Sequence, residues 1–164
     1  MPNRAFIGIG SNLGDRKANF LDALQQISRI KDTRLLKQSS LYESEPHGDA
    51  KTWFVNAVVE VETALLPEAL LKKLLEIETA MGRKRVSGKR WGSRIIDLDL
   101  ILYNNQIIDK KNLTIPHPEM TNRRFVLIPL SELAPQFIHP KLGKTVSELL
   151  ISVNDPRKIH LLRS

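Results

Sequence analysis

Two aspartates alternate with leucines in a run that otherwise has the composition of a buried strand, Ile95-Ile96-Asp97-Leu98-Asp99-Leu100-Ile101-Leu102. Because successive side chains of a strand point to opposite faces, Asp97 and Asp99 should project side by side, with Cα atoms about 6.5 Å apart. The opposite face should carry Ile96, Leu98, Leu100 and Leu102. Two carboxylates this close repel each other unless a cation neutralises them, and Mg²⁺ prefers carboxylate oxygens. The spacing therefore predicts a site for a divalent cation.

Basic residues crowd the segment just before this strand, at Arg83, Lys84, Arg85, Lys89, Arg90 and Arg94. An acidic metal-binding pair beside a cationic loop suits a polyphosphate, which needs both Mg²⁺ and guanidinium or ammonium groups. The alternative is that the acids mark the solvent face of a strand and that the basic loop is simply hydrated.

Length and composition indicate one globular domain over residues 1–164, with 41% hydrophobic and 26% charged residues. The chain has no cysteine, which excludes disulfides, thiolate metal sites and cysteine catalysis. Its net charge of +7 favours anionic partners. We find no signal region and no stretch long enough to span a bilayer, so we expect a cytoplasmic protein without a membrane partner.

Hydrophobic periodicity predicts strands at residues 4–10, 33–43, 54–63 and 94–102, and helices at 15–30 and 67–81. The first helix should bury Phe20, Leu21, Leu24 and Ile27. The apolar stripe of the second helix should be formed by Leu70, Leu71, Leu74, Leu75 and Ile77. The order of strand, helix, strand, strand, helix, strand is typical of the ferredoxin-like α+β sandwich, an antiparallel sheet with helices packed on one face. The other face would be open to a ligand. We expect residues 104–164 to add short strands and helices to the same core.

Two glycine-containing segments resemble nucleotide-binding motifs without matching them. Residues 8–14 resemble a dinucleotide fingerprint, but the third glycine is one position late. Residues 82–90 resemble a phosphate loop, but Arg90 stands where Ser or Thr is needed. We therefore interpret Gly10-Ser11-Asn12 as a tight turn leading into a helix.

The run Lys89-Arg90-Trp91-Gly92-Ser93-Arg94-Ile95-Ile96-Asp97-Leu98-Asp99 closely resembles the signature of the 6-hydroxymethyl-7,8-dihydropterin pyrophosphokinase family of folate biosynthesis. The resemblance extends over about residues 4–150. Segments that agree with it in order include Gly10-Ser11-Asn12-Leu13-Gly14, Ser39-Ser40-Leu41-Tyr42, Phe54-Val55-Asn56-Ala57, Gly82-Arg83, Pro116-His117 and Asn122-Arg123.

Membership of that family would imply transfer of the terminal pyrophosphoryl group of ATP to the hydroxymethyl group of 6-hydroxymethyl-7,8-dihydropterin, with release of AMP. It would also imply a ferredoxin-like fold and two Mg²⁺ ions held by Asp97 and Asp99. We expect a monomer that uses ATP and the pterin and has no nucleic-acid partner.

The resemblance also assigns roles to individual residues. Arg83 and Arg94 would serve transfer together with Asp97 and Asp99. The residues implied for ATP binding are Glu78, Arg85, Arg90, His117 and Arg123. Those implied for the pterin are Phe54, Asn56, Trp91, Phe125 and Asp97. Without the resemblance, Phe54 and Phe125 would be interpreted as core residues and His117 as a structural histidine.

An RNA-binding module is the leading alternative, because the same topology and a basic charge occur in RNA-binding domains that stack bases on aromatic residues. Phe6 and Phe54 could serve this purpose, but the chain has no RNP-type run of basic, Gly and aromatic residues. A regulatory or scaffold domain would explain the fold and leave Asp97, Asp99 and the arginines unexplained.

Overall fold

The structure, a computed structural model, describes residues 2–46, 51–82 and 95–163. None of the helices in these ranges has the length and apolarity that a bilayer span requires. The elements, in chain order, are β1 (Asn3–Ser11), α1 (Arg16–Ser28), β2 (Thr33–Gln38), β3 (Tyr42–Ser44), β4 (Phe54–Thr63), α2 (Pro67–Gly82), β5 (Asp97–Tyr103), β6 (Ile108–Lys110), β7 (Leu113–Ile115), the 3₁₀ helix η1 (Met120–Asn122), α3 (Arg124–Leu133), α4 (Val146–Ser152) and β8 (Ile159–Leu161).

The main sheet has the order β5-β1-β4-β3-β8, and β2 also pairs with β4. The pairs that β1 and β2 make with their neighbours are antiparallel. The predicted ferredoxin-like α+β sandwich is therefore confirmed, with β1 and β4 at its centre. The single strand predicted at 33–43 is in fact two, because Ser39 interrupts it. The Ser39 hydroxyl accepts a hydrogen bond from the Val58 backbone N–H at 2.9 Å.

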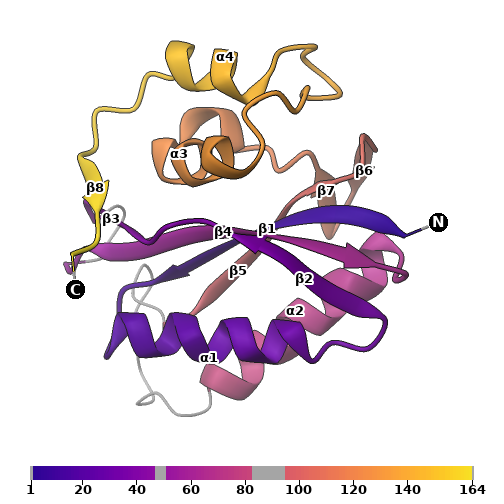
Figure 1. Cartoon of the computed structure of the whole chain (residues 1–164), viewed down its shortest axis with the longest axis horizontal. Helices are drawn as coiled ribbons and strands as arrows, with labels where there is room; N and C mark the ends of the chain where they lie inside the picture. Colours follow the sequence, from indigo (N-terminus) through magenta and orange to yellow (C-terminus); the bar gives the residue numbers. More distant parts are fainter. Residues whose placement is uncertain (1, 47–50, 83–94, 164) are drawn as a thin grey trace.

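Helices α1 and α2 cover the lower face of the sheet in Figure 1. Asp15 caps α1 by accepting a hydrogen bond from the Ala18 N–H at 3.0 Å. The helix buries Phe20, Ala23 and Ile27, whereas Leu21 is 52% exposed. The prediction for Leu21 was wrong because the buried stripe follows Phe20, Ala23 and Ile27, which share one face of the helix, and Leu21 is turned about 100° from Phe20 toward solvent. Helix α2 begins at Pro67, as predicted, and buries Leu70, Leu74 and Ile77.

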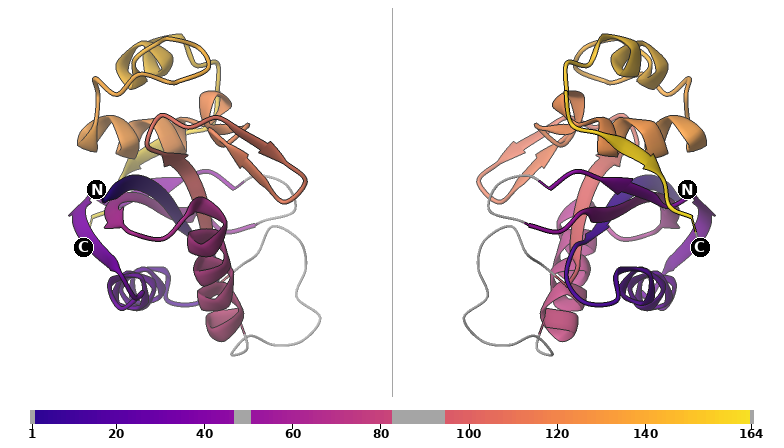
Figure 2. Two further views of the ribbon diagram at one scale, coloured as in Figure 1. Left: turned by 90° about the vertical axis from the view of Figure 1, so that its right-hand side faces the viewer. Right: turned by 90° about the vertical axis from the view of Figure 1, so that its left-hand side faces the viewer.

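Helices α3 and α4 lie on the opposite face, so the sheet is the middle of three layers (Figure 2). They form a second hydrophobic cluster with Phe6, Val58 and Ile101 of the sheet. The expectation that residues after 104 add to the same core is therefore met only in part: Leu113 and Ile115 of β7 join the first core, whereas α3 and α4 form the second cluster and cover part of the face that was expected to be open to a ligand. The sheet is apolar on this face as well, and other elements have to cover it: Phe137, which follows α3, packs against Phe6 of β1 with 5.7 Å between the ring centroids.

A register shift between Phe6 and Ile7 changes the alternation of β5. Phe6 pairs with Leu102, and Ile7 pairs with Leu100, so Ile101 is an extra residue in its strand. Leu102 consequently joins the second cluster, whereas Leu98 and Leu100 belong to the first. The prediction that Leu102 shares a face with them was therefore wrong. The bulge lies beyond the acidic pair and leaves the alternation around Asp97 and Asp99 intact.

Candidate active site

Three neighbouring strands place the acidic pair beside an amide. Asp97 and Asp99 of β5 pair with Gly10 and Gly8 of β1. Across β1, Gly10 pairs with Asn56 of β4. Asp97 and Asp99 are half-buried, and they alternate with the buried Leu98 and Leu100. The prediction that both carboxylates share one face of the strand is confirmed.

Glycines keep this face of β1 free of side chains. A Cβ on Gly8 would lie 2.9 Å from the Cδ1 atom of Ile101, and a Cβ on Gly10 would lie 3.2 Å from Oδ1 of Asn56. Both glycines belong to β1, which continues through Ser11. The turn predicted at Gly10-Ser11-Asn12 was therefore wrong, because the strand extends one residue beyond Gly10 and the glycines form the floor of a pocket.

That pocket, which we name the aromatic pocket, lies between the glycine floor and the start of α3. Its walls include Phe54, Asn56, Arg123 and Phe125, together with Asp97 and Asp99. Asn56 is 5% exposed, and its Nδ2 donates a hydrogen bond to Ser44 Oγ at 2.6 Å. Its Oδ1 is on the side of Gly10. A flat ring with hydrogen-bonding edges would find aromatic walls and a buried amide here.

A second pocket, the α2 cleft, lies on the other side of the acidic pair. Its members from β5 are Asp97, Leu98, Asp99 and Leu100. The other members come from α2 and from the chain around β7, and they are Leu71, Leu75, Glu78, Lys111, Asn112, Leu113, Thr114, His117 and Pro118. Asp97 and Asp99 therefore line both pockets and form the wall that the pockets share.

Glu78 adds a third carboxyl group near the pair. Its Oε2 accepts a hydrogen bond from the Leu98 N–H at 2.7 Å. Burial raises the pKa of Glu78 to about 7, and the charges of Asp97 and Asp99 act in the same direction, against the Leu98 hydrogen bond. Near neutral pH, Glu78 is therefore partly protonated, which lowers the repulsion within the cluster.

This raised pKa predicts a pH dependence of stability in the metal-free protein. The pKa of Glu78 rises from its ordinary value of 4.5 to about 7 in the folded chain. Between these two pH values, the folded chain therefore binds more protons at Glu78 than the unfolded chain does. The free energy of unfolding should therefore fall as the pH rises through this window. Urea unfolding in a chelating buffer from pH 5 to 8 should show Glu78→Gln gaining stability relative to the wild type as the pH rises.

Glu76→Gln is the matched control, because Glu76 is an exposed glutamate on the same helix that pairs with Lys73 at 3.5 Å. The difference in free energy of unfolding between Glu76→Gln and the wild type should stay constant from pH 5 to 8. A Glu78→Gln difference that is equally flat would contradict the pKa assignment.

His117 faces the α2 cleft as a neutral donor. Its Nδ1 accepts a hydrogen bond from the Glu119 N–H at 3.1 Å, so the proton of the neutral ring is on Nε2. Burial lowers the pKa of His117, and the charge of Arg123 lowers it further. The His117 backbone N–H donates to the Ile101 carbonyl at 2.9 Å, which fixes this residue to β5.

The donors suit Mg²⁺ bound together with a ligand. Within residues 2–46, 51–82 and 95–163, no three His, Asp or Glu side chains converge to form a complete metal cage. Mg²⁺ is commonly held by one or two carboxylates and completes its shell with water and substrate phosphates. Two half-buried aspartates at the wall of two pockets fit that pattern.

The structure brings together most of the described residues that the sequence singles out. The aromatic pocket contains Phe54, Asn56, Arg123 and Phe125, and the α2 cleft contains Glu78 and His117. The remaining residues of the predicted site, which are Arg83, Arg85, Arg90, Trp91 and Arg94, lie outside the described residues.

Sequence reasoning missed the apolar side of the α2 cleft. Leu71 and Leu75 were expected to be core residues, but Leu75 is 49% exposed and both line the cleft. The available signal was that Leu71 and Leu75 directly follow the buried Leu70 and Leu74, which widens the apolar stripe of α2 beyond what the sheet can bury. Gly8, which was interpreted only as part of a failed motif, was also missed.

The sheet face does not suit an RNA-binding module. Phe6 is 3% exposed and packs edge-on against Phe137, while α3 covers this part of β4. Such domains stack bases on exposed aromatic rings of their central strands. Phe6 is therefore not available for stacking.

The chain matches known proteins over almost its full length. The model of the 7,8-dihydro-6-hydroxymethylpterin-pyrophosphokinase (HPPK) family matches residues 6–135. The 2-amino-4-hydroxy-6-hydroxymethyldihydropteridine pyrophosphokinase of Haemophilus influenzae is 42% identical over 158 residues, which cover 96% of this chain and 97% of that protein. The protein of the same name from Methylorubrum extorquens is 39% identical over 95% of this chain and 96% of its own length.

Solved structures share the fold at lower identity. A crystal structure of an HPPK-DHPS in complex with substrates has a TM-score of 0.70 at 15% identity and matches 93% of this chain. The wild-type HPPK-DHPS of Plasmodium falciparum has a TM-score of 0.74 at 17% identity and matches 92% of this chain. This chain spans 43% and 44% of those two longer chains. On the family match and the near-complete alignment with bacterial relatives, the chain belongs to the 7,8-dihydro-6-hydroxymethylpterin-pyrophosphokinase family.

Proposed function

We propose that this chain transfers the pyrophosphoryl group of ATP to the hydroxymethyl group of 6-hydroxymethyl-7,8-dihydropterin, in folate biosynthesis. The pterin hydroxyl oxygen forms a bond to the β phosphorus and loses its proton. The bond between the β phosphorus and the α–β bridging oxygen breaks, and its electrons leave with AMP. The products are AMP, the pterin pyrophosphate and one proton.

A single observation carries this proposal: two chemically different pockets share Asp97 and Asp99 as their common wall. A transfer between two substrates needs the donor and the acceptor on either side of the groups that handle the developing charge. A binding module with one ligand would need only one of these pockets.

The aromatic pocket is the proposed site of the pterin. Phe54 and Phe125 supply aromatic walls, and the buried Asn56 supplies an amide for the hydrogen-bonding edge of the ring. The glycine floor gives a flat ring room beside the strand. Asp97 lines both pockets, so the hydroxymethyl group would have to lie near it to face the α2 cleft. Trp91, outside the described residues, is assigned to the pterin by family resemblance.

The α2 cleft is the proposed site of ATP. Leu71 and Leu75 offer an apolar surface for the adenine base, while Glu78 and His117 lie toward the acidic pair. Arg123 lines the aromatic pocket but is close enough to His117 to lower its pKa, which supports a role for this cation beside the phosphates. The arginines assigned to the phosphates and to transfer by resemblance are Arg83, Arg85, Arg90 and Arg94, all outside the described residues.

Asp97 and Asp99 are the proposed ligands of two Mg²⁺ ions. Bound Mg²⁺ would neutralise the triphosphate and stabilise charge on its oxygens. The protein's own contribution is to hold both carboxylates on one strand, beside a Glu78 whose raised pKa limits the repulsion between the three groups.

We expect His117→Ala to raise the KM for ATP about tenfold, because the variant loses a fixed donor to a phosphate oxygen. The KM for the pterin should stay within twofold, since His117 is outside the aromatic pocket. His117→Gln, whose amide can place a donor near the position of Nε2, should recover part of the loss. Steady-state kinetics with each substrate varied in turn would measure both values, and equal increases in both KM values would contradict the assignment.

The direct test uses ATP labelled separately at the β and γ phosphates, with Mg²⁺ and the dihydropterin. The proposal predicts that both labels move to the pterin and that AMP forms in equal amount. Release of ADP, with only the γ label on the pterin, would show that the chain transfers a single phosphoryl group and would contradict the proposed pyrophosphoryl transfer. Turnover of ATP that does not depend on the pterin would argue against this substrate.

Both pockets are formed by one chain and share β5, which supports a single domain that acts as a monomer. We propose that it works in the cytoplasm, where ATP is available as co-substrate. Light scattering during size-exclusion chromatography, at the concentrations used for the assay, would test the monomer.

A further inference from the structure

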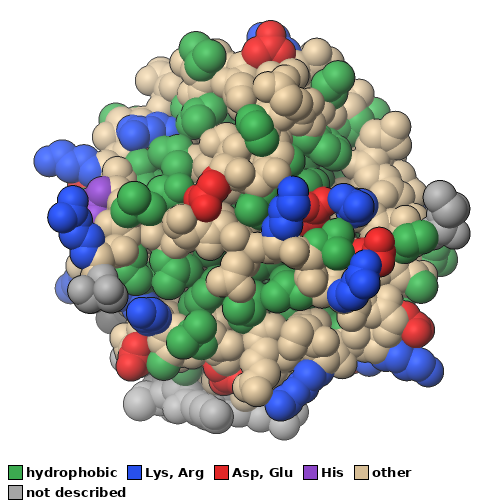
Figure 3. All heavy atoms as spheres, in the orientation of Figure 1, with side chains coloured by type: hydrophobic (Ala, Val, Ile, Leu, Met, Phe, Trp, Pro, Cys, Tyr) green, Lys and Arg blue, Asp and Glu red, His purple; other side chains and the backbone are tan. Residues whose placement is uncertain are grey.

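The C-terminal segment, residues 153–161, leads from the end of α4 past the start of α3 and ends in β8, which pairs with β3 (Figure 1). Basic side chains and a histidine gather at the edge of the surface where this segment runs (Figure 3). Asp155 is 7% exposed, although this segment lies on the surface. Neither of the two pockets includes it. Its burial therefore has a reason other than direct contact with a substrate.

Asp155 completes the N-terminus of α3, which has no cap of its own. The residue at the capping position, Arg123, makes no side-chain capping hydrogen bond. Instead, Oδ2 of Asp155 accepts a hydrogen bond from the Arg124 N–H at 3.0 Å. The first N–H groups of a helix lack intrahelical partners and favour a negative charge, so this carboxylate stabilises the point where α3 begins.

The same carboxylate holds the guanidinium group of Arg157. Nε of Arg157 donates to Oδ1 at 2.8 Å and a terminal nitrogen donates to Oδ2 at 3.0 Å, which is the two-point geometry that Arg favours. Burial alone would raise the pKa of Asp155, but the hydrogen bonds from Arg157 and the Arg124 backbone outweigh it and keep the pKa below its ordinary value. Arg124 in turn donates to the carbonyl oxygen of Arg157 at 3.1 Å.

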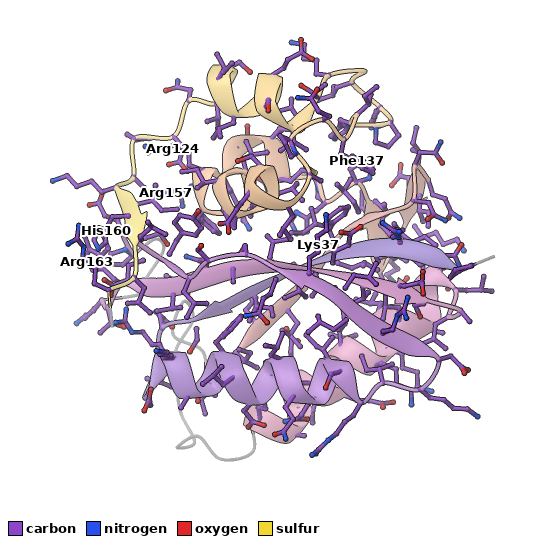
Figure 4. All side chains as sticks on the ribbon, viewed as in Figure 1. Lys37, Arg124, Phe137, Arg157, His160 and Arg163 are labelled. Atoms are coloured by element: carbon purple, nitrogen blue, oxygen red, sulfur yellow. The ribbon has the colours of Figure 1, made fainter. Side chains whose placement is uncertain are left out.

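Held in this way, the guanidinium group of Arg157 lies over the ring of Phe125, with Cζ 5.2 Å from the ring centroid. The guanidinium of Arg123 lies 5.6 Å from the same centroid. Figure 4 shows Arg124, Arg157 and His160 along one edge of the molecule, between α3 and β8. Phe125 is the second residue of α3 and a wall of the aromatic pocket. A cation at such a distance attracts the ring electrostatically and restricts its rotation.

We propose that Arg157, held by Asp155, is a positioning residue that fixes the Phe125 ring as one wall of the pterin site. This inference rests on the proposed function, because it assumes that the aromatic pocket takes the pterin. A ring that is already fixed loses less conformational freedom when the substrate binds. The contact of Arg157 with the ring therefore increases pterin affinity, although Arg157 does not touch the reacting atoms. It also gives the C-terminal segment, far from the acidic pair in sequence, a role in recognition.

Removing the guanidinium should act on pterin binding alone. Arg157→Ala should raise the KM for the pterin about three- to tenfold, with kcat and the KM for ATP within twofold of the wild type. Arg157→Lys keeps the charge but loses the two-point contact with Asp155, so its KM should be intermediate. Arg34→Ala is the matched control, since Arg34 forms an exposed ion pair with Glu62 at 3.0 Å.

A double-mutant cycle with Phe125→Ala tests whether Arg157 acts through the ring. If it does, Arg157→Ala should change the pterin KM less than twofold in the Phe125→Ala background, because no ring is left to position. A general loss of structure would instead reduce activity in both backgrounds, and urea unfolding of each variant measures such a loss directly.

Two results would overturn the inference while leaving the proposed function intact. One is an unchanged pterin KM in Arg157→Ala, with normal pterin-dependent AMP formation by the wild type. The other is a loss of the same size with and without Phe125, which would make Arg157 a direct ligand or a purely structural residue. Absence of pterin-dependent AMP formation by the wild type would overturn the function and the inference together.

Discussion

Asp97→Ala and Asp99→Ala should each lower kcat by at least about a thousandfold, since either change removes half of the donor set between the two pockets. Both variants should fold, because removing one of several neighbouring negative charges relieves repulsion. In the metal-free protein at pH 8, we expect their free energy of unfolding to equal or exceed that of the wild type. AMP formation measures the first effect, and urea unfolding measures the second.

Asp109→Ala is the control for loss of one carboxylate, because Asp109 is an exposed residue on β6. Its kcat should remain within twofold of the wild type. If Asp97→Ala or Asp99→Ala were unfolded, the pair would have a structural role. If either variant kept more than a tenth of the wild-type kcat, its carboxylate could not be an essential metal ligand.

Asn56→Ala should have the second largest effect, lowering kcat/KM for the pterin by about a hundredfold. Asn56 is 5% exposed and faces the glycine floor, so a pterin edge that loses this partner is left with an unpaired polar group in a buried site. The KM for ATP should change little. Steady-state kinetics and binding of the fluorescent pterin in the absence of ATP would separate affinity from turnover.

Ser44→Ala is the variant to compare with Asn56→Ala. It removes the hydroxyl that accepts the Asn56 hydrogen bond at 2.6 Å but leaves the amide in place. We expect it to raise the pterin KM less than tenfold, through looser orientation of the amide. A larger effect for Ser44→Ala than for Asn56→Ala would show that the hydroxyl, and not the amide, recognises the pterin.

The central part of the fold could be predicted because several short-range signals agree there. Pro67 marks the start of α2, a largely alternating pattern marks β4, and strict alternation marks the acidic segment of β5. The placement of both carboxylates on one face depends only on this alternation. The bulge at Ile101 was not predictable in the same way, because it depends on how β1 and β5 pair across many residues of sequence.

The walls of the pockets needed three-dimensional information. Whether Leu75 is a core residue or lines a cleft depends on the sheet edge that α2 crosses, and no periodicity contains that information. The same holds for Asp155, which reaches the Arg124 N–H, and for Arg157, which reaches Phe125, because both contacts form only where the chain returns past α3 to pair β8 with β3. The resemblance supplied Phe125 as a candidate, and the structure supplied its neighbours.

The proposed function requires that Asp97 and Asp99 hold Mg²⁺ between a pterin in the aromatic pocket and ATP in the α2 cleft. A crystal structure with Mg²⁺, the pterin and an ATP analogue that cannot be cleaved between its α and β phosphates tests it most directly. We predict metal ions about 2.0–2.1 Å from oxygens of both aspartates, with the β phosphate facing the pterin hydroxymethyl group. A bound nucleotide whose phosphates lie away from Asp97 and Asp99, with no metal on either carboxylate, would contradict the account.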